Sequence, residues 1–339
     1  MPPLVSILIP CRNDEVYIGR CLDAILASDY PGHRLEILVV DGGSTDGTRP
    51  ILVRYAALHP SIVLLDSPSG TTPAGLNLAI RSASGDFVVR MDARVLYPPD
   101  YIPLLVAALQ EAGVDNVGGV MEMIPGDESP IARAIAVGLA HPFGAGESTA
   151  ARERRAVHTV PLGCCRHQIF DRIGMFDEEL TRHYDEEFNV RAMSNGGRVL
   201  LIPEARCRYL APWSIHELAR MHYEGGYFKP LVARKVGQVM TIRQSIPALL
   251  VGSMSSTAAL APWLPAARYI FALLAGFYAL LVVLFAAGVV RSHGFRCAAA
   301  LLVIFPVLHF SYGGGLLRGI RDHLVAYTAP RPFALHLCR

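Results

Sequence analysis

Apolar runs and polar turns alternate along the first two thirds of the chain. Residues 5–10 and 35–40 are apolar runs rich in strand-forming side chains, and each is followed by a polar turn that opens a helix-like segment. The same pattern predicts further strands at residues 62–66, 86–91, 114–122 and 198–202, and helices at residues 48–59, 73–83, 99–113, 186–194 and 215–234. Strands that alternate with helices of about ten to fifteen residues are typical of βαβ units, so we expect an α/β fold around a mostly parallel sheet.

Between residues 125 and 160 this periodic pattern fades. The stretch is rich in Gly, Pro and Ala, and Arg152, Arg154 and Arg155 lie close together in it. We expect either a mobile loop that faces an anionic ligand or the membrane surface, or a solvated linker.

The last third of the chain has a different composition. From residue 244 onwards it contains seven Arg and a single acidic residue, Asp322, and almost everything between them is apolar. Residues 269–290 carry no charge, and this length is enough to cross a hydrocarbon core of about 30 Å at about 1.5 Å per residue. Residues 297–317 are uncharged apart from one His, whereas prolines interrupt residues 244–267, which are a crossing or a re-entrant segment. We therefore expect two or three transmembrane helices rather than a buried core helix.

These segments divide the chain into three parts. Residues 1–213 are expected to form the α/β domain, residues 214–243 an amphipathic segment at the membrane interface, and residues 244–339 a membrane-embedded tail. No signal peptide is recognisable, because the first apolar run has no basic region before it and breaks at Pro10. We therefore expect a multi-pass protein of the cell (inner) membrane whose first domain is cytoplasmic, in agreement with the Lys and Arg residues that precede the tail.

Charge and cysteine content narrow the class further. The net charge of +2 gives no indication of a nucleic-acid partner. Seven cysteines without metal-ligand spacing match a reducing compartment, and we expect the Cys164–Cys165 pair to be packed and inert.

Candidate binding residues follow the first two strands. Asn13 and Asp14 lie in the first turn, and Asp41 ends the second strand and begins the sequence Asp-Gly-Gly-Ser-Thr-Asp-Gly-Thr. In open α/β sheets, ligands bind outside the carboxyl ends of the strands, where these turns are expected. A single Asp in a turn also has local structural roles, so the argument depends on the whole arrangement. That arrangement resembles the nucleotide-binding half of the family 2 glycosyltransferases, and the resemblance implies their GT-A fold.

The resemblance also implies how the nucleotide is held. Pro10, Asn13, Asp14 and Asp41 occupy the positions that contact the base and ribose of a nucleotide-sugar in the family. Carboxylates suit this task because imide N–H and ribose O–H groups are donors, and an ionised acceptor gives a shorter and stronger hydrogen bond. Asn77 lies in the segment that the family uses beside the nucleotide, with an ordinary position on a helix surface as the alternative.

A metal site is implied at the end of the fourth main strand. The family places an Asp-x-Asp motif there, which holds Mg²⁺ or Mn²⁺ against the diphosphate, but this chain has Asp92-Ala93-Arg94. Arg is cationic at any working pH and is not a metal ligand. Either Asp92 alone anchors the metal, because Mg²⁺ needs few protein ligands beside phosphates, or Arg94 takes over part of the charge neutralisation. We expect that the metal is retained at Asp92.

A candidate general base lies in the sequence Tyr184-Asp185-Glu186-Glu187. The family has a Glu-Asp motif here, so Asp185 matches its catalytic Asp, whereas Tyr184 replaces the usual Glu. A carboxylate within reach of a sugar hydroxyl can accept its proton during attack. We expect Asp185 to be the base, with Glu186 as the second candidate, and Asp185 is also a natural N-cap for the following helix.

The expected activity follows from the branch of the family that the chain resembles. The Gln-x-x-Arg-Trp motif of processive relatives is missing, which favours single-sugar transfer. The resemblance to the bacterial exopolysaccharide branch, which includes the succinoglycan enzyme ExoA, runs through nearly the whole chain. It implies a membrane-anchored inverting enzyme that transfers one sugar from a nucleotide-diphosphate sugar, with UDP-glucose as the suggested donor, to a polyprenyl-linked or other lipid-linked saccharide. The departures at Arg94 and Tyr184 leave an alternative, a non-catalytic nucleotide-sugar- or lipid-binding subunit of a polysaccharide assembly complex.

Overall fold

The structure consists of two compact units. It is a computed structural model that describes residues 1–144, 153–237 and 240–325. The first unit combines Met1–Glu122 with Thr149–Leu210, and the second combines Met123–Ser148 with Ala211–Arg339. Among the described residues, 123–144 cluster with the C-terminal helices, whereas the sequence analysis placed the domain boundary after residue 213.

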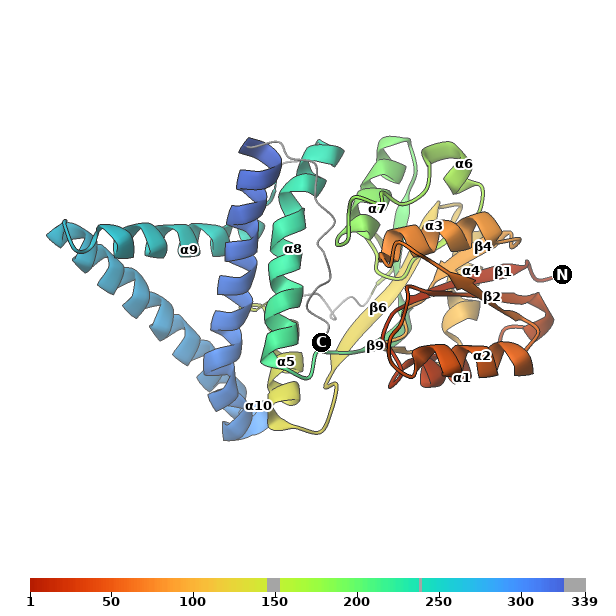
Figure 1. Cartoon of the computed structure of the whole chain (residues 1–339), viewed down its shortest axis with the longest axis horizontal. Helices are drawn as coiled ribbons and strands as arrows, with labels where there is room; N and C mark the ends of the chain where they lie inside the picture. Colours follow the sequence, from red (N-terminus) through yellow and green to blue (C-terminus); the bar gives the residue numbers. More distant parts are fainter. Residues whose placement is uncertain (145–152, 238–239, 326–339) are drawn as a thin grey trace. The chain divides into compact units, whose positions relative to one another are not determined.

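The first unit is built on a mixed sheet (Figure 1). Within the described residues its strand order is β3-β2-β1-β4-β8-β6-β9-β5, and β7 pairs with β9 outside this path. The strands are β1 (Val5–Cys11), β2 (Leu35–Asp41), β3 (Ile62–Asp66), β4 (Phe87–Arg90), β5 (Val95–Leu96), β6 (Asn116–Ile124), β7 (Arg155–Ala156), β8 (Cys164–Arg166) and β9 (Val199–Leu210). Strands β3, β2, β1 and β4 are parallel, whereas β8 pairs antiparallel with both β4 and β6, and β5 and β7 pair antiparallel with β9.

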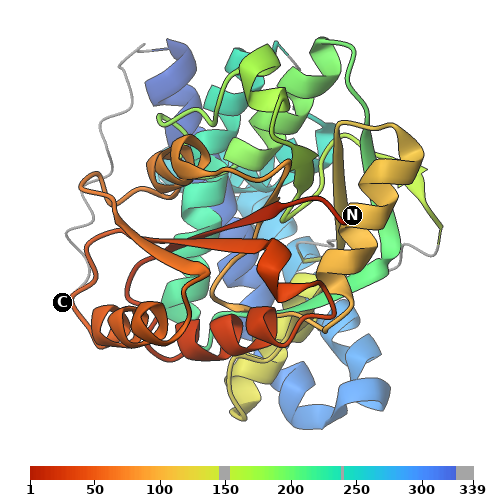
Figure 2. The same cartoon turned by 90° about the vertical axis from the view of Figure 1, so that its right-hand side faces the viewer.

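Helices cover both faces of this sheet, and α3 lies on the opposite side from α1 and α2 (Figures 1 and 2). The helices and helical turns of the unit are α1 (Ile18–Leu26), η1 (Gly32–Arg34), α2 (Thr48–Leu58), α3 (Thr72–Ser82), α4 (Tyr101–Ala112), α6 (Ile169–Ile173) and α7 (Tyr184–Ser194). Alternate residues of β1 enter the main core with the apolar face of α1, because successive side chains of a strand point to opposite faces. On the other face, Gly75 of α3 lets the helix approach Pro10 and Val40 closely.

The register of the parallel strands brings their carboxyl ends to one edge. Cys11 lies opposite Asp41, and Asp41 lies opposite Asp66. Strand β4 runs in the same direction and ends opposite Leu8, and the Met91 amide that follows it donates to the Leu8 carbonyl, so Asp92 comes next toward this edge. The chain proceeds from β1 to β2 on one side and places β4 on the other, which makes the end of β1 a topological switch point, the usual ligand site of such sheets.

The second unit is helical. Its helices are α5 (Pro130–Ala140), α8 (Ile215–Val236), α9 (Ile242–Leu260), α10 (Pro265–Ile320) and the π-helical turn η2 (Arg321–Val325). The prediction of a loop or linker at residues 125–160 is therefore wrong for α5. Ser129 caps this helix by accepting a hydrogen bond from the Ala132 amide, and the apolar residues of the helix pack in a core with α10.

Of the predicted arginine cluster, Arg152 lies outside the described residues, and Arg154 is ion-paired with Glu111 and Glu204.

Helix α10 contains the two most apolar predicted segments. Gly294 interrupts it with φ 83° and ψ 166°, a conformation that glycine adopts without steric cost, so two helices meet there. Taken together, Pro265–Val325 is the one stretch of the described residues that is long and apolar enough to cross a membrane. Helix α9 continues through Pro247 and does not meet that criterion. The count of apolar helices therefore does not support the prediction of two or three crossings.

Glycines allow α8 and α10 to touch backbone to backbone. A Cβ atom added at Gly315 would lie 2.1 Å from the carbonyl oxygen of Tyr223, and one added at Gly319 would lie 2.2 Å from that of Tyr227. Small residues at such spacing permit the close helix contacts that are common in membrane domains.

Candidate functional site

The turns after β1 and β2 interlock at the carboxyl edge of the sheet. Asn13 has φ 55°, a left-handed conformation that Asn tolerates, and its side-chain oxygen accepts a hydrogen bond of 2.8 Å from the Thr45 amide. The Asn13 amide donates to Ser44 Oγ at 3.0 Å, and the Asp14 amide donates to Thr48 Oγ1 at 2.8 Å. Asn13 therefore shapes the edge by tying one turn to the other.

Three of the predicted carboxylates lie around the end of β1. Burial first, and then the negative charges of Asp14, Asp41 and Asp92, raise the pKa of the Cys11 thiol. Asp41 lies opposite Cys11 in the register of β1 and β2, and Arg94 contacts both Asp14 and Asp92, so these carboxylates lie close together at the end of the strand. Cys11 itself stays a neutral, buried thiol.

Asp41 is largely used by its own turn. Its Oδ1 accepts hydrogen bonds from the amide and the hydroxyl of Ser44, at 2.9 and 2.7 Å, and its Oδ2 lies 3.4 Å from Arg49 Nη1. The residue is only 4% exposed. The local turn role that the sequence left open is present, and only a small part of the carboxylate faces solvent.

Arg94 crosses from the end of β4 to the turn after β1. Its Nε lies 3.2 Å from Asp14 Oδ1, and its guanidinium lies over the ring of Tyr17, 5.2 Å from the ring centroid. Burial raises the pKa of Asp14, although the Arg94 cation acts in the opposite direction. The third position of the Asp-x-Asp motif thus supplies a positive charge where the family has a carboxylate.

Asp92 is the most accessible of the predicted site carboxylates. Its Oδ1 accepts a hydrogen bond of 3.0 Å from the Arg94 amide, its Oδ2 lies 3.9 Å from Arg90 Nη2, and its side chain is 35% exposed. The described residues contain no group of three or more His, Cys, Asp or Glu that could hold a metal ion. The donor set therefore fits a divalent cation held by one carboxylate and otherwise by phosphates and water, which is a common arrangement for Mg²⁺.

Asp185 reaches the same edge from α7. Arg90, the last residue of β4, is ion-paired through Nη1 with Asp185, and its Nη2 donates to the Tyr184 hydroxyl at 2.6 Å. Burial raises the pKa of Asp185, and the Arg90 cation opposes this shift. Because Arg90 is also close to Asp92, it links the two carboxylates that the sequence assigned to the base and to the metal.

Helix α7 begins differently from the prediction. Its N-cap is His183, which has φ 61°, so the expectation that Asp185 is the N-cap is wrong. Asp185 and Glu186 lie in the first turn, where carboxylates interact favourably with the helix dipole. Glu186 Oε2 lies 3.4 Å from His183 Nδ1.

Asn77 is not an exposed residue of the helix surface, which was the alternative left open by the sequence. It is 4% exposed, and its amide nitrogen donates to the Phe176 carbonyl at 2.9 Å and to Glu178 Oε1 at 2.8 Å. Its side-chain oxygen accepts a hydrogen bond of 2.9 Å from the Phe176 amide. Asn77 therefore holds the segment that precedes α7.

The sequence analysis missed Arg90. A signal was present, since an Arg closes the otherwise apolar strand Phe-Val-Val-Arg two residues before Asp92. A cation on a buried strand needs counter-charges, but its main partner lies 95 residues further along the chain.

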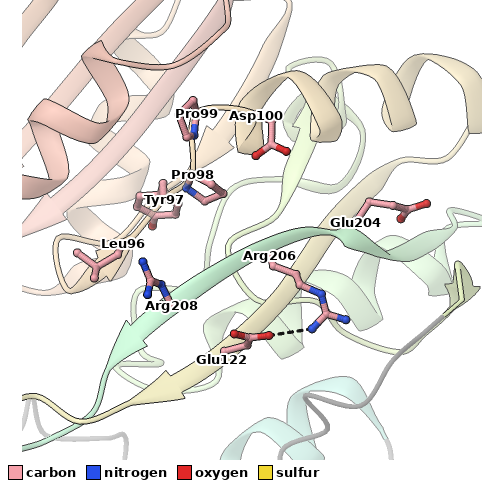
Figure 3. A pocket seen from close by; sticks show the side chains of 9 residues that line it. All are labelled: Leu96, Tyr97, Pro98, Pro99, Asp100, Glu122, Glu204, Arg206 and Arg208. Carbon is pink, nitrogen blue, oxygen red and sulfur yellow. Dashed lines mark hydrogen bonds and ion pairs between the residues drawn. The ribbon is translucent and has the colours of Figure 1, made fainter.

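A separate hollow of about 540 Å³ lies beside β5, β6 and β9 (Figure 3). None of the predicted site residues line this hollow. Its lining consists mostly of charged residues and prolines: Leu96, Tyr97, Pro98, Pro99, Asp100, Glu122, Glu204, Arg206 and Arg208. Arg206 and Glu122 form an ion pair of 2.8 Å within it, and Glu204 is paired with Arg154. Much of its charge is thus balanced internally.

Comparison with known proteins identifies the family. Residues 6–174 match the sequence model of glycosyl transferase family 2. The chain is 30% identical over 208 residues to the succinoglycan biosynthesis protein ExoA of Rhizobium meliloti, a match that covers 60% of this chain and 62% of the relative's length. It is 27% identical over 240 residues to a dolichyl N-acetyl-alpha-D-glucosaminyl phosphate 3-beta-D-2,3-diacetamido-2,3-dideoxy-beta-D-glucuronosyltransferase of Methanococcus voltae, covering 68% of this chain and 74% of that one.

Solved structures support the same assignment at the level of the fold. The mannosyltransferase PcManGT of Pyrobaculum calidifontis, in complex with GDP-Man and Mn²⁺, has a TM-score of 0.58 at 24% identity, covering 91% of this chain and 87% of its own. The predicted GT-A fold with a helical C-terminal region is confirmed. From its sequence match and its fold, the chain belongs to glycosyl transferase family 2.

Proposed function

We propose that this chain is a membrane-anchored, inverting glycosyltransferase that moves one sugar from a UDP-sugar to a lipid-linked saccharide. The observation that carries the proposal is the grouping of Asp14, Asp92 and Asp185 with two cations, Arg90 and Arg94, at the carboxyl edge of the sheet. A nucleotide-diphosphate sugar needs donors and acceptors for its nucleoside and positive charge for its diphosphate. Transfer of the sugar also needs a base near the anomeric carbon that accepts the proton of the acceptor hydroxyl. The carboxyl edge of the sheet has residues suited to each of these three tasks.

Each residue has a task in the proposed reaction. Pro10, Asn13, Asp14 and Asp41 form the floor against which base and ribose lie. Arg94 brings positive charge toward the diphosphate, whose negative charge grows as the bond to the sugar breaks. Asp185 accepts the proton of the acceptor hydroxyl as its oxygen attacks the anomeric carbon from the side opposite the leaving diphosphate. Glu186, one residue further along the first turn of α7, is the second candidate for this proton transfer.

A divalent cation, Mg²⁺ or Mn²⁺, completes the proposed site. Asp92 would hold it through the carboxylate oxygen that does not accept from the Arg94 amide. The bound cation would supply further charge stabilisation for the leaving diphosphate. The solved neighbour in complex with GDP-Man and Mn²⁺ supports this part of the proposal.

The acceptor is inferred from the second unit and from the relatives. Helix α10 is long and apolar enough to anchor the chain. As part of the proposal, the first unit lies on the cytoplasmic side of the membrane. The relative from Methanococcus voltae is named for a dolichyl-phosphate-linked acceptor, and the relative from Rhizobium meliloti for succinoglycan biosynthesis. An enzyme held at the membrane meets a lipid-linked saccharide by diffusion in two dimensions.

Radiolabelled sugar transfer tests this proposal. Purified full-length chain would be incubated with Mg²⁺ or Mn²⁺, a panel of UDP- and GDP-sugars that starts with UDP-glucose, and a lipid extract. We expect label in the lipid fraction from a UDP-sugar, and loss of that label in Asp185→Asn. Binding of UDP-sugar without transfer from any donor would instead favour the non-catalytic binding subunit, for which the departures at Arg94 and Tyr184 are the motivation.

A further inference from the structure

Arg90 contacts both the proposed metal carboxylate, Asp92, and the proposed base, Asp185. Arg90 closes β4, its side chain is 11% exposed, and its partners come from α7 and from the segment after β4. Its guanidinium lies over the ring of Tyr184, 4.9 Å from the centroid, and donates to the hydroxyl of the same residue. The ring and hydroxyl of Tyr184 thus fix the orientation of the Arg90 guanidinium, while its Nη1 is ion-paired with Asp185.

We propose that Arg90 is the positioning residue of the site, which holds the Asp185 carboxylate at the carboxyl edge of the sheet beside Asp92, and that Tyr184 is its support. This inference rests on the proposed function and names a residue on which the proposed base depends. The Asp185 carboxylate is partly withdrawn from solvent, with 28% of its side chain exposed, so a fixed counter-charge favours its ionised form and holds it in place. The planar guanidinium, which can bind two acceptors at once, supplies both conditions in a way that a Lys ammonium does not.

The identity of residue 184 follows from the same geometry. A Glu at this position would place a second carboxylate against Arg90 and would compete with Asp185 for its charge. A Tyr offers a neutral acceptor and an aromatic face instead, so the positive charge stays available to Asp185 and Asp92. Burial raises the pKa of the Tyr184 phenol, which keeps it neutral. The departure from the family motif is therefore compatible with catalysis.

The far side of Arg90 borders a small hollow. Its Nε is buried without a hydrogen-bond partner, and so is Oδ1 of Asn116, and both residues line a hollow of about 20 Å³. This volume has room for one water molecule, which would accept from Nε and donate to the Asn116 oxygen. Asn116 in turn donates to Asn189 of α7 at 2.6 Å. Arg90 is thus connected to α7 directly through Asp185, and a water molecule in this hollow would add a second link through Asn116 and Asn189.

Kinetics of Arg90 variants test the inference. In Arg90→Gln, we expect the kcat of sugar transfer to fall about 100-fold while the Kd for UDP changes less than about threefold, because misplacing a catalytic group affects the chemical step. The acid limb of the kcat profile should move to higher pH, because the loss of the cation raises the pKa of Asp185, with Asp92, His183 and Tyr184 as the other ionisable groups that face it. Arg166→Gln is the matched control, since Arg166 lies on β8 against Phe87 and away from the carboxylates.

A double-mutant cycle separates positioning from an independent role. If Arg90 acts through Asp185, Arg90→Gln should lower kcat less than about threefold further in an Asp185→Asn background, because interacting residues are not additive. Multiplied effects of the two substitutions would overturn the inference, as would an unchanged kcat in folded Arg90→Gln.

Arg90→Lys keeps the inference testable if Arg90→Gln does not fold. One ammonium cannot reproduce the paired hydrogen bonds, so we expect a kcat about tenfold below that of the native chain with unchanged UDP affinity. Native kcat in Arg90→Lys would overturn the inference. A native chain that transfers no sugar would count against the proposed function, whereas an active native chain with an equally active Arg90→Gln would count against the inference alone.

Discussion

Replacement of Asn77 tests whether this residue binds the nucleotide or stabilises the fold. The family resemblance places it beside the nucleotide, but the structure uses all of its amide hydrogen-bonding groups to hold residues 176 and 178. Replacement by Ala removes three hydrogen bonds from a site that is almost completely buried, and leaves the N–H and C=O groups of Phe176 without their partners. At about 1 kcal/mol for each lost hydrogen bond, Asn77→Ala should lower the free energy of unfolding by about 3 kcal/mol.

Pulse proteolysis of the full chain in detergent, over a series of urea concentrations, measures this loss. Asn195→Ala is the matched control, because Asn195 is exposed and its side chain donates one hydrogen bond, to the Arg191 carbonyl. We expect its free energy of unfolding to change by less than about 0.5 kcal/mol. The Kd for UDP, measured in the absence of urea, should be the same in both variants and in the native chain. Native stability of Asn77→Ala together with a tenfold weaker UDP affinity would refute the structural role.

Three further outcomes follow from the site and the helices. Burial raises the pKa of Asp185 above its ordinary value of 3.8, so the base loses its charge as the pH falls through that raised pKa. The acid limb of the kcat profile should therefore lie above pH 3.8. A limb at or below this value would contradict the assignment of Asp185 as the base. Removal of divalent cations with EDTA should abolish sugar transfer, and Mn²⁺ or Mg²⁺ should restore it. Asp92→Asn should weaken cation-dependent UDP binding at least tenfold. Full activity in EDTA would show that Arg94 alone is sufficient to neutralise the diphosphate. Gly315→Ala should destabilise the contact between α8 and α10 by about 1–3 kcal/mol in thermal unfolding, because the added Cβ would meet a backbone oxygen. Gly314→Ala is the control, since its added Cβ would meet no other atom. Equal melting temperatures of the two variants would contradict the packing of α8 on α10.

The parallel part of the sheet could be predicted because its signals are local. The run Val5–Cys11 and the run Leu35–Asp41 are long, apolar and closed by polar turns, and the strands occur where these signals lie. Helix α5 could not be predicted in the same way. Its small residues form no distinct polar face, and its stability comes from packing on α10, which is remote in sequence. Gly138 illustrates this, since its neighbours are Leu301, Ile304 and Leu308.

The candidate site was predictable in its parts but not in its connections. The acidic residues at the strand ends were visible in the sequence, and the structure brings Asp14, Asp41 and Asp92 to the end of β1. The N-cap of α7 was assigned to Asp185 because caps are usually read from side-chain type, whereas His183 takes that place through a left-handed backbone that no local pattern indicates. The pairing of Arg90 with Asp185 spans the chain from β4 to α7, and only the folded sheet defines it.

A structure of the chain with a bound UDP-sugar and Mn²⁺ tests the central claim most directly. We expect the diphosphate and the metal at the carboxyl edge of β1 and β4, in contact with Asp92 and Arg94, with Asp185 beside the anomeric carbon. Nucleotide bound in the hollow lined by Arg206 and Arg208, or an anomeric carbon turned away from Asp185, would contradict the account.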